Sequence, residues 1–177
     1  MDDAGLVRIV DAAMAEAARK AGAWLVCRPG CNACCIGPFE ITALDAGRLR
    51  RGLAELDAAN PERAERVRQR AEARLAKFED DDPCPALDPA SGLCDLYAAR
   101  PITCRTFGPP VHCDSGGVGV CELCFEGATD DEIAACEVEV DPEGLEARLN
   151  EALGGAGVAS VAAALAGPWP TTKRSDC

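Results

Sequence analysis

The sequence predicts a mainly α-helical fold with long irregular loops, a small single domain organised around a thiolate-rich metal site. Twelve of the 177 residues are cysteines, and ten of them lie between Cys27 and Cys124. The chain has a single histidine, His112, so a metal site here would be built almost wholly from thiolates. Thiolate ligands select zinc or iron–sulfur clusters, whereas magnesium and calcium prefer oxygen ligands.

Residues 1–26 are expected to hold an N-terminal helix. Within residues 3–21, apolar side chains recur at helical spacing with charged side chains between them, at Leu6, Ile9, Val10, Ala13, Met14 and Ala17. Gly22 follows this pattern and is expected to end the helix, because glycine readily adopts the left-handed conformation of a helix C-terminus.

Residues 27–124 are expected to form a cysteine-cluster domain with a helical insert at about residues 42–79. Thr42 can cap the first helix of this insert, which continues to about residue 56. Asn60 and Pro61 mark the start of the second helix, which extends to about residue 78. The insert therefore separates two cysteine-rich loop regions.

Beyond the insert, residues 84–124 contain many prolines and glycines and are expected to be mostly loop, with one helical turn near residues 95–99. Residues 125–167 are expected to form C-terminal helices, at about residues 129–137, 142–153 and 157–166. Residues 168–177 are expected to be a disordered tail that ends in the free thiol of Cys177.

The net charge of −12 argues against nucleic acid as a partner. Residues 78–177 carry five basic and nineteen acidic side chains, which suits either a docking face for a basic protein partner or a solvated surface. No stretch approaches the roughly 18 apolar residues of a membrane span, so no membrane is expected as a partner. The acidic start lacks the features of an export signal, and a cytoplasmic location, where thiols stay reduced, is expected.

The first cysteine motif has the spacing Cys27-x3-Cys31-x2-Cys34-Cys35. Two cysteines separated by two residues can reach one metal from a single tight turn. Adjacent side chains point in different directions in an extended chain, so Cys34 and Cys35 are not expected to share one tetrahedral ion. Either each serves a different centre, or one is a ligand and the other packs in the protein interior.

The second motif contains Cys84, Cys94 and Cys104, separated by two gaps of nine residues. Pro85 directly follows Cys84, a pairing that also occurs in some ferredoxin cluster sequences. Arg100 and Arg105 flank Cys104, where they can either offset the charge of thiolates or form ion pairs with carboxylates.

These pieces together resemble the CxxCxxCC or YkgJ-like family of cysteine-cluster proteins, over roughly residues 27–124. The resemblance rests on the first motif and on the elements Cys84-Pro85-x-Leu87, Gly92-x-Cys94-x-Leu96-Tyr97 and Arg100-Pro101-x2-Cys104-Arg105-x-Phe107. One departure is the gap of three residues between Cys27 and Cys31, where the family has two.

The resemblance implies a zinc- or iron-chelating protein. The family has one further cysteine after its Cys-Arg-x-Phe element, and Cys121 and Cys124 are preferred for it over Cys113, because their spacing is typical of ligands. Cys136 is expected to be a small buried hydrophobic residue. The predicted metal ligands are Cys27, Cys31, Cys34, Cys35, Cys84, Cys94, Cys104, Cys121 and Cys124.

A related flagellin lysine methylase has a similar cysteine cluster and an iron–sulfur centre, which favours a [4Fe–4S] cluster over zinc as the cofactor. The main hypothesis is a metal-binding protein without an assigned reaction. Alternatives are a structural zinc protein with four-thiolate sites, an iron–sulfur enzyme or redox protein related to the methylase, a metal-delivery or metal-sensing protein, and a fold held by disulfides. No residue is nominated as catalytic, since no Ser/His/Asp arrangement is credible in a chain with a single histidine.

Overall fold

The fold is described from a computed structural model, for residues 2–37, 39–77, 79, 81–112, 117–154 and 157–167. It is mainly helical, as predicted, and the chain divides into two compact units. The first unit comprises Met1–Cys34 and Arg100–Ala156, and the second comprises Cys35–Ala99 and Gly157–Cys177. Among the described residues, no helix combines the length and apolar character needed to cross a membrane.

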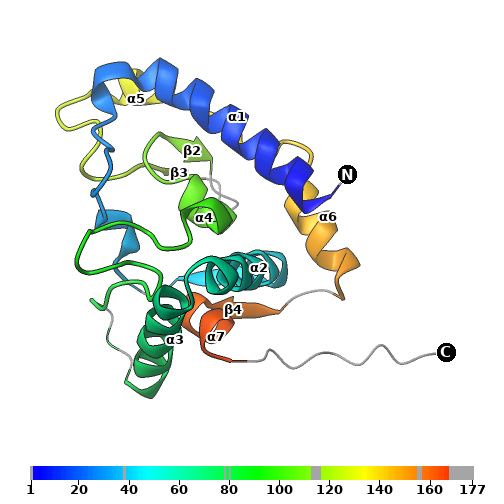
Figure 1. Ribbon diagram of the computed structural model, residues 1–177. Coiled ribbons are helices and arrows are strands. Elements are labelled where there is room, and N and C mark those ends of the chain that lie inside the picture. Colours follow the sequence, from blue (N-terminus) through cyan, green and yellow to red (C-terminus); the bar gives the residue numbers. More distant parts are fainter. Residues whose placement is uncertain are drawn as a thin grey trace. The chain divides into compact units, whose positions relative to one another are not determined.

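In the first unit, α1 (Asp3–Ala21) is the longest element (Figure 1). The Asp2 side chain caps it by accepting a hydrogen bond from the Gly5 N–H at 2.9 Å. Gly22 ends it with a φ of 52° and begins the short 3-10 helix η1 (Gly22–Trp24). The predicted helix over residues 3–21 is therefore confirmed.

The other elements of the first unit are short. The helices α4 (Ile102–Arg105) and α6 (Leu145–Ala152) pack against α1. The strands β2 (Val111–His112) and β3 (Val118–Gly119) form an antiparallel pair. The helix α5 (Asp130–Ala135) begins with a capping box between Thr129 and Glu132. The buried apolar side chains of the first unit include Leu6, Val10, Ile102 and Leu145, and two small clusters, Ala17 with Val111 and Val138, and Ala21 with Cys124, Phe125 and Cys136.

The second unit is built around two longer helices, α2 (Ala43–Ala59) and α3 (Pro61–Ala76). Thr42 caps α2 by accepting from the Asp45 N–H at 3.2 Å, and Asn60 caps α3 by accepting from the Arg63 N–H at 3.0 Å. Both predicted helix starts are confirmed. The second unit also contains the 3-10 helix η3 (Tyr97–Ala99), which confirms the turn predicted near residues 95–99.

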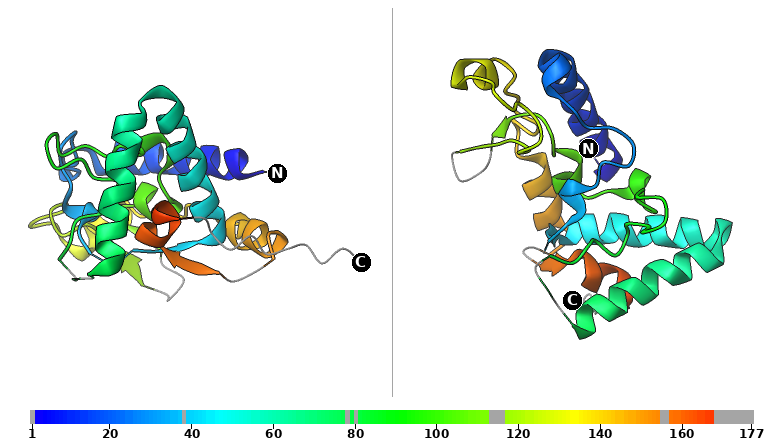
Figure 2. Two further views of the ribbon diagram at one scale, coloured as in Figure 1. Left: turned by 60° about the horizontal axis from the view of Figure 1, so that its bottom comes forward. Right: turned by 90° about the vertical axis from the view of Figure 1, so that its left-hand side faces the viewer.

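A two-stranded antiparallel sheet completes the second unit. β1 (Glu40–Thr42) pairs with β4 (Val158–Ser160), with Ile41 opposite Ala159. The chain then enters α7 (Val161–Ala166), which packs beside α3 (Figures 1 and 2). The buried core of this unit extends over α2, α3 and α7 and includes Leu49, Leu53, Val67, Val161 and Leu165.

Three sequence expectations are corrected. The helix predicted over residues 157–166 is a strand up to Ser160, because these residues pair with β1. The helices predicted at residues 129–137 and 142–153 are shorter, since α5 and α6 begin later and end earlier. The expected tail at residues 168–177 and Cys113 lie outside the described residues.

The 3-10 helix η2 (Ala33–Cys35) spans the boundary between the two units.

Gly52 lies where α2 packs against η3, and it permits a very close approach. A Cβ atom at residue 52 would overlap the Cβ atom of Ala99. We expect Gly52→Ala to lower the free energy of unfolding by about 1–3 kcal/mol, the usual cost of overpacking. Gly47→Ala in the same helix should raise it by about 0.5–1 kcal/mol, because its nearest neighbour would be the Arg51 guanidinium at 3.6 Å. Urea denaturation of both variants measures the difference, and equal effects would contradict the packing described.

Candidate metal centre

The nine predicted metal ligands divide between the two units. Cys27, Cys31, Cys34, Cys104, Cys121 and Cys124 belong to the first unit, and Cys35, Cys84 and Cys94 belong to the second. The boundary passes between the adjacent residues Cys34 and Cys35. Within the described part of the chain, Cys27, Cys31, Cys84, Cys121, Cys124 and Cys136 are free thiols.

In the first unit, four thiols form what we call the first thiol group: Cys27, Cys31, Cys121 and Cys124. The Sγ atoms of Cys27 and Cys124 are 4.0 Å apart, although 97 residues separate them in the chain. The pKa of the Cys27 thiol is raised to about 12 by desolvation, and next by the neighbouring thiol of Cys124. Cys121 and Cys31 add smaller contributions of the same sign, which groups them with this pair.

Tight turns and one glycine position this group. The Cys31 N–H donates to the Arg28 carbonyl and the Cys124 N–H donates to the Cys121 carbonyl, both at 2.9 Å. The Cys121 N–H also donates to the Gly108 carbonyl at 3.2 Å. Gly108 has a φ of 119°, and a Cβ there would lie 3.3 Å from the Cys27 Sγ. Only glycine combines that backbone conformation with so close a sulfur atom.

Aromatic residues pack beside the first thiol group. Phe125, directly after Cys124, stacks on Trp24 with ring centroids 6.2 Å apart, and its N–H donates to the Trp24 carbonyl at 3.2 Å. Phe125 is also the one non-glycine residue with a positive φ, 60°, within the described chain. Sequence reasoning missed this contact. The available signals were the scarcity of aromatic residues and the position of Phe125 next to a predicted ligand.

In the second unit, Cys35, Cys84 and Cys94 form what we call the second thiol group. The Cys84 N–H donates to the Cys35 carbonyl at 2.7 Å, which holds these two residues together. An isolated antiparallel bridge joins Leu87 to Cys94 and closes the loop after Cys84. Burial raises the pKa of the Cys84 thiol to about 11, although N–H groups of Ala86 and Leu87 lower it.

The sequence left two alternatives for the arginines near Cys104, and the structure decides between them for Arg105. Arg105 donates to both carboxylate oxygens of Asp11, at 2.8 and 3.0 Å, so the carboxylate alternative holds for it. Arg74 is the arginine whose positive charge lowers the pKa of Cys84. It is buried, and it donates to the Gly37 carbonyl at 2.8 Å. Its role could not be read from the sequence, because it lies ten residues before Cys84 in a helix.

The described side chains are not arranged as a formed metal site. Across the described residues, no three Cys, His, Asp or Glu side chains are gathered at metal-binding distances. Cys136 is buried in an apolar cluster with Cys124 and Phe125, as predicted. Metal binding at either thiol group would therefore require the thiols to lose their protons and to close around the ion.

The raised pKa of Cys84 gives a testable reactivity. Because thiolate is the nucleophile, we expect Cys84 in the metal-free folded protein to react with iodoacetamide at pH 8 on the order of 100-fold more slowly than in urea, where its pKa is about 8.5. The raised pKa also stabilises the metal-free fold below about pH 8.5, and this contribution is lost as the pH rises through about 11. Peptide mass spectrometry measures the rate. Equal rates with and without urea would contradict the burial of this thiol.

Comparison with known proteins identifies the family. A family model named CxxCxxCC and described as "Putative zinc- or iron-chelating domain" matches residues 26–126, which contain every predicted ligand. No curated protein and no solved structure matches the chain. Since the match covers more than half of the 177 residues, the chain belongs to the CxxCxxCC family of zinc- or iron-chelating domains.

Proposed function

We propose that the protein binds a single zinc or iron ion through the thiolates of the first thiol group. The observation that carries this proposal is the 4.0 Å separation of the Cys27 and Cys124 sulfur atoms. A tetrahedral site with metal–sulfur bonds of about 2.3 Å has sulfur atoms about 3.8 Å apart. The spacing of this pair is thus close to that of ligands on one ion.

The chemistry of the four residues fits such an ion. Cys27 and Cys31 come from one turn, and Cys121 and Cys124 come from another, as in four-thiolate zinc sites. Neighbouring thiolates repel one another, and this repulsion adds to the desolvation that raises the pKa of Cys27. A divalent cation would offset this repulsion and favour the deprotonated form, so metal binding would release protons.

A second candidate is the iron–sulfur cluster predicted from the sequence, with [4Fe–4S] as its form. The three residues of the second thiol group support it, because they supply thiolates beyond those that one ion needs. Three thiolates leave one coordination position for another ligand or a substrate, which suits the alternative of an iron–sulfur enzyme or redox protein. Cys34 and Cys104 remain proposed ligands without an assigned centre.

We also propose a cytoplasmic location. The proposed ligand chemistry supports it, since thiolate sites need reduced cysteines and reducing compartments keep thiols reduced. The basic protein partner suggested by the acidic second half of the chain stays a prediction.

Metal and acid-labile sulfide analysis of anaerobically purified protein tests the proposal. We expect zinc or iron without a stoichiometric amount of sulfide, and the loss of one metal equivalent in a C27A/C124A variant. Cys136→Ala is the matched control, because Cys136 is buried in the same apolar cluster as Cys124 and is not in the first thiol group. Full metal content in C27A/C124A would overturn the proposal, and iron with equimolar sulfide would favour the second candidate.

A further inference from the structure

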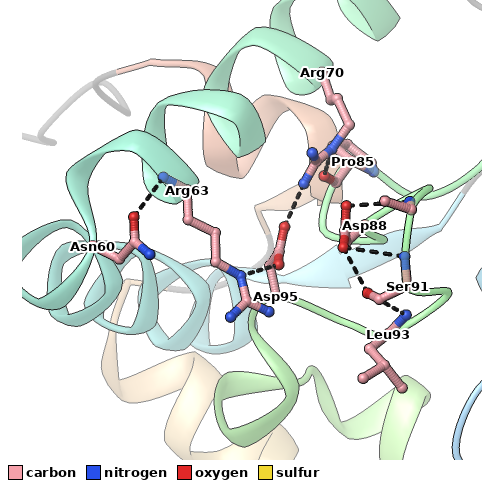
Figure 3. Close-up of polar contacts among 9 residues, drawn as sticks. Asn60, Arg63, Arg70, Pro85, Asp88, Ser91, Leu93 and Asp95 are labelled. Carbon is pink, nitrogen blue, oxygen red and sulfur yellow. Dashed lines mark hydrogen bonds and ion pairs between the residues drawn. The ribbon is translucent and has the colours of Figure 1, made fainter.

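The carboxylate of Asp95 lies between two arginines of α3 (Figure 3). Arg63 Nε donates to one oxygen, and Arg70 donates to the other at 2.5 Å. The Asp95 side chain is only 2% exposed. Removing one partner from a buried ion pair is costly, so this arrangement holds α3 firmly to the residue that follows Cys94.

Arg70 makes a second contact with the same loop. Its Nε donates to the Pro85 carbonyl at 2.8 Å (Figure 3). Pro85 directly follows Cys84, and Asp95 directly follows Cys94. One guanidinium group therefore links the two residues that come after the two cysteines, and it limits the separation of their backbones.

The loop between the two cysteines is itself closely bonded. The Asp95 N–H donates to the Ala86 carbonyl at 2.7 Å, and the Asp88 N–H donates to the Leu93 carbonyl at 2.9 Å. The Asp88 carboxylate accepts from the N–H and the hydroxyl of Ser91 (Figure 3). The contacts of Arg63 and Arg70 with Pro85 and Asp95, at the base of this loop, can therefore fix the whole loop as one rigid body.

The charges at this base balance one another. Two guanidinium groups share the Asp95 carboxylate, and the Asp88 carboxylate of the same loop offsets the second positive charge. The buried guanidinium of Arg74 lies close to Cys84 and also pairs with Asp82 at 3.4 Å. Cationic neighbours favour deprotonated sulfur, the form that binds metals.

We propose that Arg70 and Asp95 are positioning residues that hold the thiols of Cys84 and Cys94 at the separation needed to bind one thiophilic centre together. The guanidinium fork is essential to this role, because lysine carries the charge but cannot reach Pro85 and Asp95 in the same geometry. That the centre bound by this pair is a metal rests on the proposed function. The positioning of the two thiols by Arg70 and Asp95 does not rest on it.

A trivalent arsenical tests the positioning without any metal. Phenylarsine oxide condenses with two neighbouring thiols to form two As–S bonds, with loss of water and no change of oxidation state. In the metal-free full-length protein, we expect it to bridge Cys84 and Cys94, as seen by peptide mass spectrometry. The bridging rate should fall about tenfold or more in Arg70→Lys and in Asp95→Asn, because the two thiols lose their mutual orientation.

Arg68→Lys is the matched control. Arg68 is on the same helix, but it pairs with Asp57 at 3.0 Å and should leave the rate unchanged. Bridging of Cys27 to Cys124 in the same molecules is the internal reference, and hydrogen exchange over α2 reports that the second unit is folded. Unchanged bridging of Cys84 to Cys94 in folded Arg70→Lys and Asp95→Asn would overturn the inference. If positioning holds but neither thiol group binds zinc or iron, the proposed function fails alone.

Discussion

Chelation of the bound metal should unfold the cysteine loops of the first unit and leave the second unit folded. Metal bound to four thiolates contributes about 10–16 kcal/mol in small zinc domains at neutral pH. The apolar cluster beside the cysteines is small, with Ala21, Cys124, Phe125 and Cys136 as its buried members, whereas Leu6, Val10, Ile102 and Leu145 are buried elsewhere in the first unit. The small burial beside the cysteines offsets only part of the entropy cost of ordering their loops.

Hydrogen exchange with and without a strong chelator measures this effect for each unit separately. Protection should be lost around Cys27, Cys31, Cys121 and Cys124 and kept in α2 and α3. The C27A/C124A variant should already show the unprotected pattern without chelator. Cys136→Ala should behave like the wild type, apart from a fall of about 1 kcal/mol in the free energy of unfolding, the cost of about one buried methylene. Full protection of these cysteine loops after complete metal removal would contradict the claim that metal holds them together.

The second unit should depend instead on its apolar core, and Leu49→Ala is the sharpest test. Leu49 is 2% exposed and lies in the core built by α2, α3 and α7. Truncating a buried leucine removes transfer free energy and leaves a cavity, so we expect the free energy of unfolding to fall by about 2–5 kcal/mol. The slowest-exchanging amides of α3 report this value.

Leu75→Ala is the matched control in the same unit. Leu75 is 53% exposed, so its truncation should change the free energy of unfolding by less than about 0.5 kcal/mol. If the two leucines had equal effects, the core assignment would be wrong. Removing the ion of the first thiol group should not enlarge the Leu49→Ala effect, since that group and this core lie in different units.

The helices were predictable where their signals are local. Gly22 ends α1, Thr42 caps α2, and Asn60 with Pro61 begins α3, each through contacts within one helical turn. The strand β4 was missed because its partner, β1, is more than 100 residues away. Residues 158–160 carry no alternating pattern that would distinguish a strand from a helix.

The grouping of the cysteines was only partly predictable. Their spacing indicated ligands, and the expectation that Cys34 and Cys35 do not share one ion stays a prediction, although the two residues fall in different units. Spacing alone does not reveal that Cys27 lies 4.0 Å from Cys124, because that contact spans 97 residues. The same limit applies to Arg105, whose partner Asp11 is 94 residues away, and to the ion pair of Arg70 with Asp95.

X-ray absorption at the metal edge of the anaerobically purified protein tests the central claim most directly. A single ion in the first thiol group predicts four sulfur neighbours at about 2.3 Å and no metal–metal scattering. The same sample of C27A/C124A should lack this signal. Nitrogen or oxygen neighbours in place of sulfur would contradict thiolate binding, and iron–iron scattering would contradict a single ion in favour of a cluster.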